Sequence, residues 1–110
     1  MWIRLCLESS GLRRYEGLRL EYQVRLQQAG NQVTGDGYKL RENERTVGNR
    51  TPITLIGDVI GDRVVLNFQE RGTRRMSGGR LVLDRESENV LRGRFSSDAA
   101  KSSGVADAHR

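Results

Sequence analysis

Cys6 and His109, which have the chemistry of a nucleophile and a base, are each the only residue of their kind in the chain. A catalytic base needs a second group that orients it and a pocket that holds it. His109 is the penultimate residue, and we expect it to lie in a solvated tail. One thiol and one imidazole cannot supply the N and S ligands of a zinc site. We therefore predict no metal, no cofactor and no catalytic residues, and we interpret Cys6 as a small buried side chain.

The carboxylates do not form a catalytic pair either. Asp58 and Asp62 flank a predicted hairpin turn and Asp36 lies between two glycines, positions where aspartate commonly bonds to nearby backbone. No predicted strand carries two carboxylates on its apolar face. The glycines at 35, 37, 78 and 79 lack the following helix whose N-terminus would bind phosphate. We therefore favour a non-enzymatic function.

Arginine dominates the basic residues. The net charge is +5, and 17 of the 19 basic residues are arginine. This excess is consistent with anion recognition, because the guanidinium group matches phosphate and carboxylate, and equally with a GC-rich bacterial genome. The densest cluster is interpreted as an anion-binding rim or, alternatively, as a solvated turn; it comprises Arg71, Arg74, Arg75 and Arg80.

The element most clearly encoded is a strand over residues 18–27, where apolar and polar side chains alternate without exception. A period of two places Leu18, Leu20, Tyr22, Val24 and Leu26 on one face of an extended chain. The opposite face is polar and suits water. A strand with one wet face belongs to an antiparallel sheet.

The whole chain is predicted to be one all-β domain, residues 1–110. Short alternating segments are separated by turn residues, and no amphipathic helical segment is found. Glycines at 35, 37, 78 and 79 indicate bulges or bends, with a slip of phase between Val33 and Tyr38. Eight predicted strands cover residues 2–8, 18–27, 33–40, 51–59, 64–69, 76–84, 90–96 and 102–109.

Closure is the expected arrangement of these strands. An open antiparallel up-and-down meander of about eight strands would leave two exposed edges, which a closed barrel removes. A two-sheet β-sandwich is the alternative that periodicity leaves open. A barrel of this size has room for only a small cavity.

Trp2 in the first strand, Arg94 in the seventh and Arg110 after the last resemble the calycin barrels, the lipocalin and avidin group. The resemblance implies that Trp2 packs on Arg110 or Arg94 and closes one end of the barrel. The hairpin of residues 55–58 and 64–68 is similar to hairpins of avidin-like barrels, and residues 91–104 resemble uncharacterised bacterial β domains. Met1 stands where lipocalins have glycine, and Trp2 is the only tryptophan, so biotin binding is not implied.

The function expected from these features is a non-enzymatic binding or interaction module. Its partner would be a small hydrophobic or anionic ligand, or a protein. Nucleic acid is not favoured because the chain has only six aromatic residues. With no apolar run long enough for a membrane helix and no signal peptide, we expect a cytoplasmic protein without membrane contact. The predicted site has five wall residues and two rim residues: Tyr22, Tyr38, Phe68, Met76 and Phe95, with Arg74 and Arg75 at the rim.

Two alternatives belong to other classes of function. A structural or oligomerising accessory domain of a larger bacterial protein would fit a barrel filled by side chains. An enzyme that acts by the shape of its cavity would need a cavity of several hundred Å3.

Overall fold

A computed structural model describes residues 1–10, 17–43, 45–46, 51–72, 76–98 and 102–110. These residues form nine strands and no helix. No described segment is therefore a helix long and apolar enough to cross a membrane. The strands are β1 (Trp2–Ser10), β2 (Arg19–Ala29), β3 (Gln32–Glu42), β4 (Arg45–Thr46), β5 (Pro52–Ile60), β6 (Arg63–Arg71), β7 (Met76–Ser87), β8 (Val90–Ser97) and β9 (Ser102–His109).

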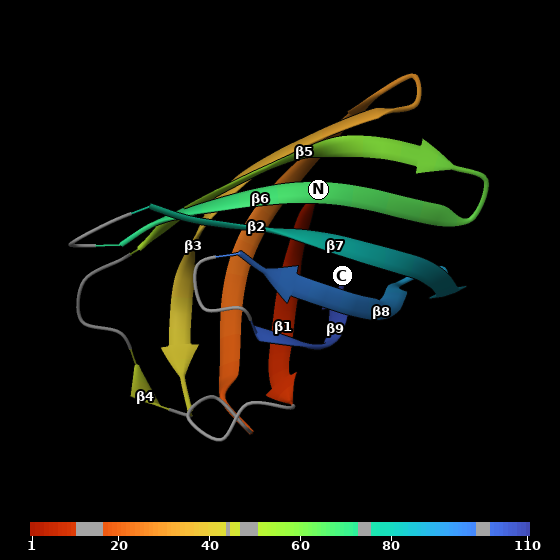
Figure 1. Cartoon of the computed structure of the whole chain (residues 1–110). Coiled ribbons are helices and arrows are strands. Elements are labelled where there is room, and N and C mark those ends of the chain that lie inside the picture. Colours follow the sequence, from red (N-terminus) through yellow and green to blue (C-terminus); the bar gives the residue numbers. More distant parts are fainter. Residues whose placement is uncertain (11–16, 44, 47–50, 73–75, 99–101) are drawn as a thin grey trace.

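The predicted antiparallel barrel is confirmed. Strand β1 pairs with β2 on one side and with β9 on the other, and β2 also pairs with β3. The ring continues through β5, β6, β7 and β8 to β9, so eight strands close on themselves. Figure 1 shows β1, β2 and β3 side by side, with β5 to β8 crossing over them. The two-residue β4 lies in a region expected to be a loop and pairs only with β3.

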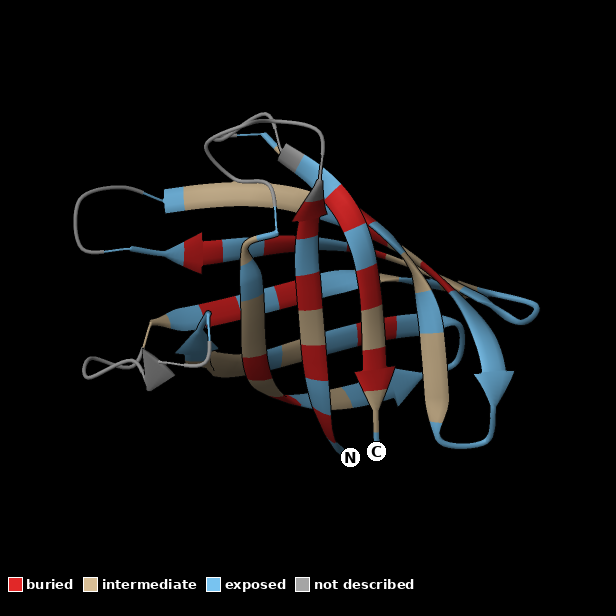
Figure 2. Cartoon of the chain, turned by 90° about the horizontal axis from the view of Figure 1, so that it is seen from below, coloured by how far each residue is buried: buried red, intermediate tan, exposed pale blue. Residues whose placement is uncertain are grey.

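Alternation along the strands builds the core. On β1, Ile3, Leu5 and Leu7 are buried, whereas Trp2 and Glu8 are exposed. Bands of buried and exposed residues alternate in the same way along the other strands (Figure 2). The inward-facing apolar side chains form one cluster that draws on every strand of the closed ring. Because apolar burial is the main favourable term in folding, this pattern determines which face of each strand points inward.

The expected phase slip at Gly35 and Gly37 is wrong. Val33, Gly35, Gly37 and Lys39 share the inward phase of β3, and the register shift lies further on, where Leu40 is the extra residue. A Cβ added to Gly37 would lie 1.9 Å from the carbonyl oxygen of Gln23. These glycines therefore permit a close approach of β2 and a sharp bend of β3, the coiling that closes a small barrel.

Two other glycines accommodate aromatic rings. Phe68 on β6 lies directly opposite Gly79 on β7, and Phe95 on β8 lies opposite Gly104 on β9. A Cβ on Gly79 would lie 2.4 Å from Cζ of Phe68, and one on Gly104 would lie 3.0 Å from Cε1 of Phe95. Each ring thus lies over the backbone of its glycine partner, the arrangement by which aromatic residues cover strand glycines.

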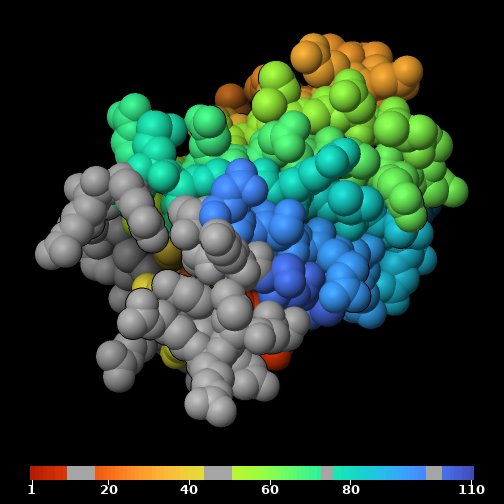
Figure 3. Space-filling view, in the orientation of Figure 1, coloured from red at the N-terminus to blue at the C-terminus, as the bar shows by residue number. Residues whose placement is uncertain are grey.

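The outer face carries a cross-strand row of alternating charge. Arg63, Asp84, Arg92 and Asp107 are successive register partners on β6, β7, β8 and β9. Nε of Arg63 lies 2.8 Å from the carboxylate of Asp84. In Figure 3 the surfaces of β6, β7 and β8 lie next to one another on one face of the molecule. Opposite charges that face one another across strands favour this register, and Arg92 forms its ion pair with Glu86 on β7.

Trp2 does not close the end of the barrel. It follows the outward phase of β1, and 52% of its surface is exposed. Arg94 also follows the outward phase of its strand and is exposed. The expected packing of Trp2 against Arg94 or Arg110 at the end of the barrel is therefore wrong, because the alternation of β1 places Ile3, not Trp2, on the inner face.

Candidate functional site: a cavity in one half of the barrel

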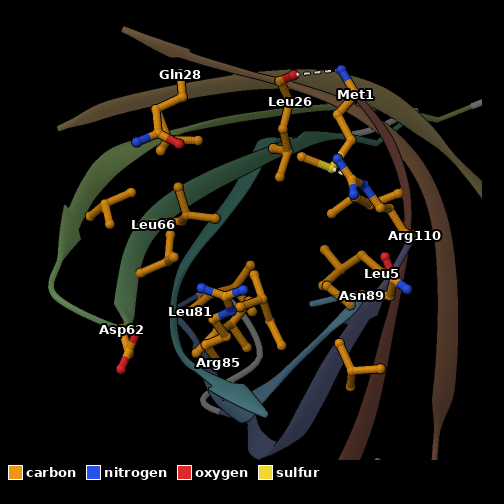
Figure 4. Close-up of a pocket in the computed structure, with 18 of the residues that line it drawn as sticks. Met1, Leu5, Leu26, Gln28, Asp62, Leu66, Leu81, Arg85, Asn89 and Arg110 are labelled. Atoms are coloured by element: carbon orange, nitrogen blue, oxygen red, sulfur yellow. Dashed lines mark hydrogen bonds between the residues drawn. The ribbon is translucent and has the colours of Figure 1, made fainter. Parts of the chain in front are cut away.

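The barrel has a cavity of about 380 Å3 that opens at one end. Its mouth lies between the β2–β3, β5–β6 and β7–β8 turns, beside Met1 and Arg110. Figure 4 shows side chains from several strands converging on this space. We call this part of the barrel the hollow half, and define it by the apolar strand residues that line the cavity: Ile3, Leu5, Leu26, Val33, Leu55, Val59, Val64, Leu66, Leu81, Leu83, Val90, Leu91 and Ala108.

The cavity exists because the apolar part of its wall is built from aliphatic side chains of moderate size. Ala108 contributes a single methyl group where β9 crosses the wall, and none of the aromatic residues in the described part of the chain lines the space. Eight strands enclose an interior just wide enough to be filled by large side chains or to hold one small ligand. Small and medium residues at inward positions therefore leave room.

The opposite part of the interior, which we call the filled half, is occupied by Tyr22, Phe68 and Phe95, together with Lys39 and Glu70. The hydroxyl of Tyr22 donates a 2.9 Å hydrogen bond to Oε2 of Glu70. The ammonium group of Lys39 pairs with Oε1 of the same carboxylate and lies 5.8 Å from the centroid of the Tyr22 ring. Burial, and then the Glu70 carboxylate, raise the pKa of Tyr22 well above its ordinary value.

This polar cluster is internally satisfied. Among the described residues, no buried side-chain nitrogen or oxygen is without a hydrogen-bond partner. Buried polar groups that satisfy one another hold a unique packing, so we interpret the cluster as structural. Sequence reasoning missed Glu70 and Lys39. Glu70 could have been found, because it continues the inward phase of Leu66 and Phe68 on β6.

None of the described residues of the predicted site lines the cavity. Tyr22, Phe68 and Phe95 are buried, as their phase indicated, but they belong to the filled half. Tyr38 is half-buried on the outward phase of β3, and Met76 is 52% exposed at the start of β7. The two predicted rim residues, Arg74 and Arg75, lie outside the described residues.

Cys6 and His109 lie on the outer surface of the barrel. Cys6 is half-buried, between Glu21 and Asp107 in the register of its two neighbouring strands. Partial burial, and then these carboxylates, raise the pKa of the Cys6 thiol, which makes it a weak nucleophile at neutral pH. His109 lies in β9 rather than in a tail, with Nε2 2.9 Å from Oδ1 of Asp107. The described residues contain no group of three potential metal ligands.

Comparisons of this chain with protein-family models, curated proteins and solved structures found no match.

Proposed function

We propose that this protein is a non-enzymatic binding module whose barrel takes up one small, largely apolar molecule. The observation that carries the proposal is the cavity of about 380 Å3 with an aliphatic wall and a polar mouth. Small-molecule sites typically occupy roughly 300–1,000 Å3 and combine an apolar wall with a few polar groups. The cavity lies at the lower end of that range and suits a ligand with an apolar part of about ten carbon atoms.

Burial of apolar surface would supply the affinity. Each methylene group removed from water contributes about 0.8 kcal/mol, so a ten-carbon chain contributes roughly 8 kcal/mol. Loss of translational and rotational freedom opposes this gain by at least about 4 kcal/mol. The net gain is therefore at most roughly 4 kcal/mol, which corresponds to a dissociation constant of about 1 mM.

We also propose a relationship to the calycin barrels. A closed eight-stranded barrel with a cavity at one end agrees with this proposal.

Titration with the neutral fluorescent probe N-phenyl-1-naphthylamine tests the proposal. Ala108→Phe would fill the cavity from β9, whereas Val105→Phe places the same ring on the exposed outer face of that strand. We expect saturable fluorescence enhancement with the wild type and Val105→Phe, and at least tenfold weaker binding with Ala108→Phe. Circular dichroism verifies that each variant is folded. Absence of saturable binding to the folded wild type would overturn the proposal and favour a structural module.

A further inference from the structure

Few charged residues of the described chain occupy inward-facing positions. Within the barrel they are Lys39 and Glu42 on β3, Glu70 on β6 and Arg85 on β7; Glu42 is the register partner of the inward-facing Leu20. Arg110 follows directly after β9 and continues the inward phase of Ala106 and Ala108. Lys39 and Glu70 neutralise one another in the filled half. The two arginines both line the cavity of the hollow half.

Arg85 is placed to reach the contents of the cavity. It follows Leu81 and Leu83 on the inward phase of β7 and is the register partner of Leu91, another wall residue. Figure 4 shows its side chain beside that of Leu81, within the ring of lining residues. No described carboxylate lies within 4.0 Å of its guanidinium nitrogens.

Arg110 supplies a second cation at the same mouth. Its Nε donates a hydrogen bond of 3.1 Å to Sδ of Met1, and a thioether is a weak, uncharged acceptor. The carboxylates of Asp62 and Glu88 also line the mouth, but both residues lie in turns, and neither carboxylate is within 4.0 Å of either guanidinium. In Figure 4 the Asp62 carboxylate points away from the other labelled side chains.

We infer that the ligand is an amphiphile with one apolar chain and an anionic headgroup, which Arg85 and Arg110 hold at the mouth while the chain occupies the hollow half. This inference rests on the proposed binding function and names its ligand class. A guanidinium group binds a carboxylate through charge-assisted and often bidentate hydrogen bonds. Because the mouth is open to solvent, the guanidinium groups of both arginines stay hydrated in the unliganded protein, and their charges are not buried.

Displacement of bound N-phenyl-1-naphthylamine by three ten-carbon compounds tests the headgroup. Decanoate is anionic, decanol is neutral and decyltrimethylammonium is cationic. We expect decanoate to displace the probe from the wild type at a concentration roughly three- to tenfold lower than decanol, and decyltrimethylammonium to be the weakest competitor. Added salt should reduce the advantage of decanoate, because it screens charges at an exposed mouth.

Variants test whether the preference for decanoate over decanol arises at the mouth of the cavity. Arg85→Gln combined with Arg110→Gln should make decanoate and decanol equally effective competitors, when each is compared with the affinity of the same variant for the probe. The control, Arg94→Gln, removes an exposed arginine from the outward phase of β8 and should retain the preference. Equal displacement of the probe by decanoate and decanol from the wild type would overturn this inference but leave the proposed function intact. Equal loss of the preference in Arg94→Gln would also overturn it, whereas failure of the probe itself to bind overturns the proposed function.

Discussion

The two halves of the barrel are built on the same alternating strands but contain different interiors. In the filled half, Tyr22, Phe68 and Phe95 reach across the interior, and glycines on neighbouring strands make room for the two phenylalanine rings. In the hollow half the inward positions hold aliphatic side chains, with Arg85 and Arg110 at the mouth, and about 380 Å3 stays open. A strand pattern therefore determines which side chains point inward, whereas the size of those side chains determines whether the interior is solid.

This difference suggests that one half of the barrel provides stability and the other provides the binding site. The filled half has close-packed rings and a satisfied Tyr22–Glu70–Lys39 cluster, and close packing is where a small domain gains most of its stability. The hollow half has fewer internal contacts, because an open space provides no partner atoms for its lining. We expect stability to be concentrated in the filled half and ligand binding in the hollow half.

The largest expected effect is from truncation in the filled half. Tyr22→Ala should lower the free energy of unfolding by about 3–5 kcal/mol, because it removes a buried ring and deprives Glu70 of its hydroxyl donor. Leu26→Ala, on the same strand but in the hollow half, should cost less than about 2 kcal/mol. Urea denaturation of both variants measures the difference. Equal costs would contradict a difference in packing between the halves.

Enlarging a side chain gives a matched comparison on β9. Ala106 and Ala108 are both buried and inward-facing, with 2% and 3% of their surface exposed, but only Ala108 lines the cavity. Ala106→Leu should destabilise the protein by about 1–3 kcal/mol, because it overpacks a filled region. Ala108→Leu extends into open space and should change the stability by less than about 1 kcal/mol. If Ala108→Leu is the more damaging of the two, the assignment of the halves is wrong.

A smaller effect is expected at alkaline pH. The pKa of Tyr22 is raised in the folded state, so its contribution to stability is complete below the unfolded value of about 10 and is lost as the pH rises above it. Above that pH the free energy of unfolding should decrease by up to about 1.4 kcal/mol per pH unit through this residue. Tyr22→Phe should remove that component from the slope between pH 10 and 11.5. An unchanged slope would show that Tyr22 ionises as readily in the folded chain as in the unfolded chain, which would contradict a raised pKa.

The fold could be predicted because the alternation of apolar and polar residues can be seen within each short segment of the sequence. Residues 18–27 alternate without exception, and each of the eight strands of the ring lies within a few residues of its predicted range. The phase slip predicted in β3 is wrong because a glycine gives no sign of which face it occupies. Gly35 and Gly37 continue the inward phase, and the assumed slip transferred Tyr38 to the wrong face.

The site could not be predicted in the same way. The position of a side chain along the barrel axis depends on the register between strands, which the local pattern does not give. Staggered, tilted strands bring Leu83 into the wall of the cavity but leave Phe68 outside it, and both residues have the same local pattern. Arg85 was missed because the predicted strand ended at residue 84, whereas β7 continues to Ser87. Its inward phase with Leu81 and Leu83 is visible only when the strand is extended.

Ligand binding in the hollow half can be tested most directly by methyl nuclear magnetic resonance of the wild-type protein titrated with decanol. We expect saturable chemical-shift changes for the methyl groups of Val33, Leu83 and Leu91, which line the cavity. The methyl groups of Leu7 and Ile53, which are buried but do not line the cavity, should change little. The largest changes at Leu7 and Ile53, or no saturable change at any methyl group, would contradict binding in the hollow half.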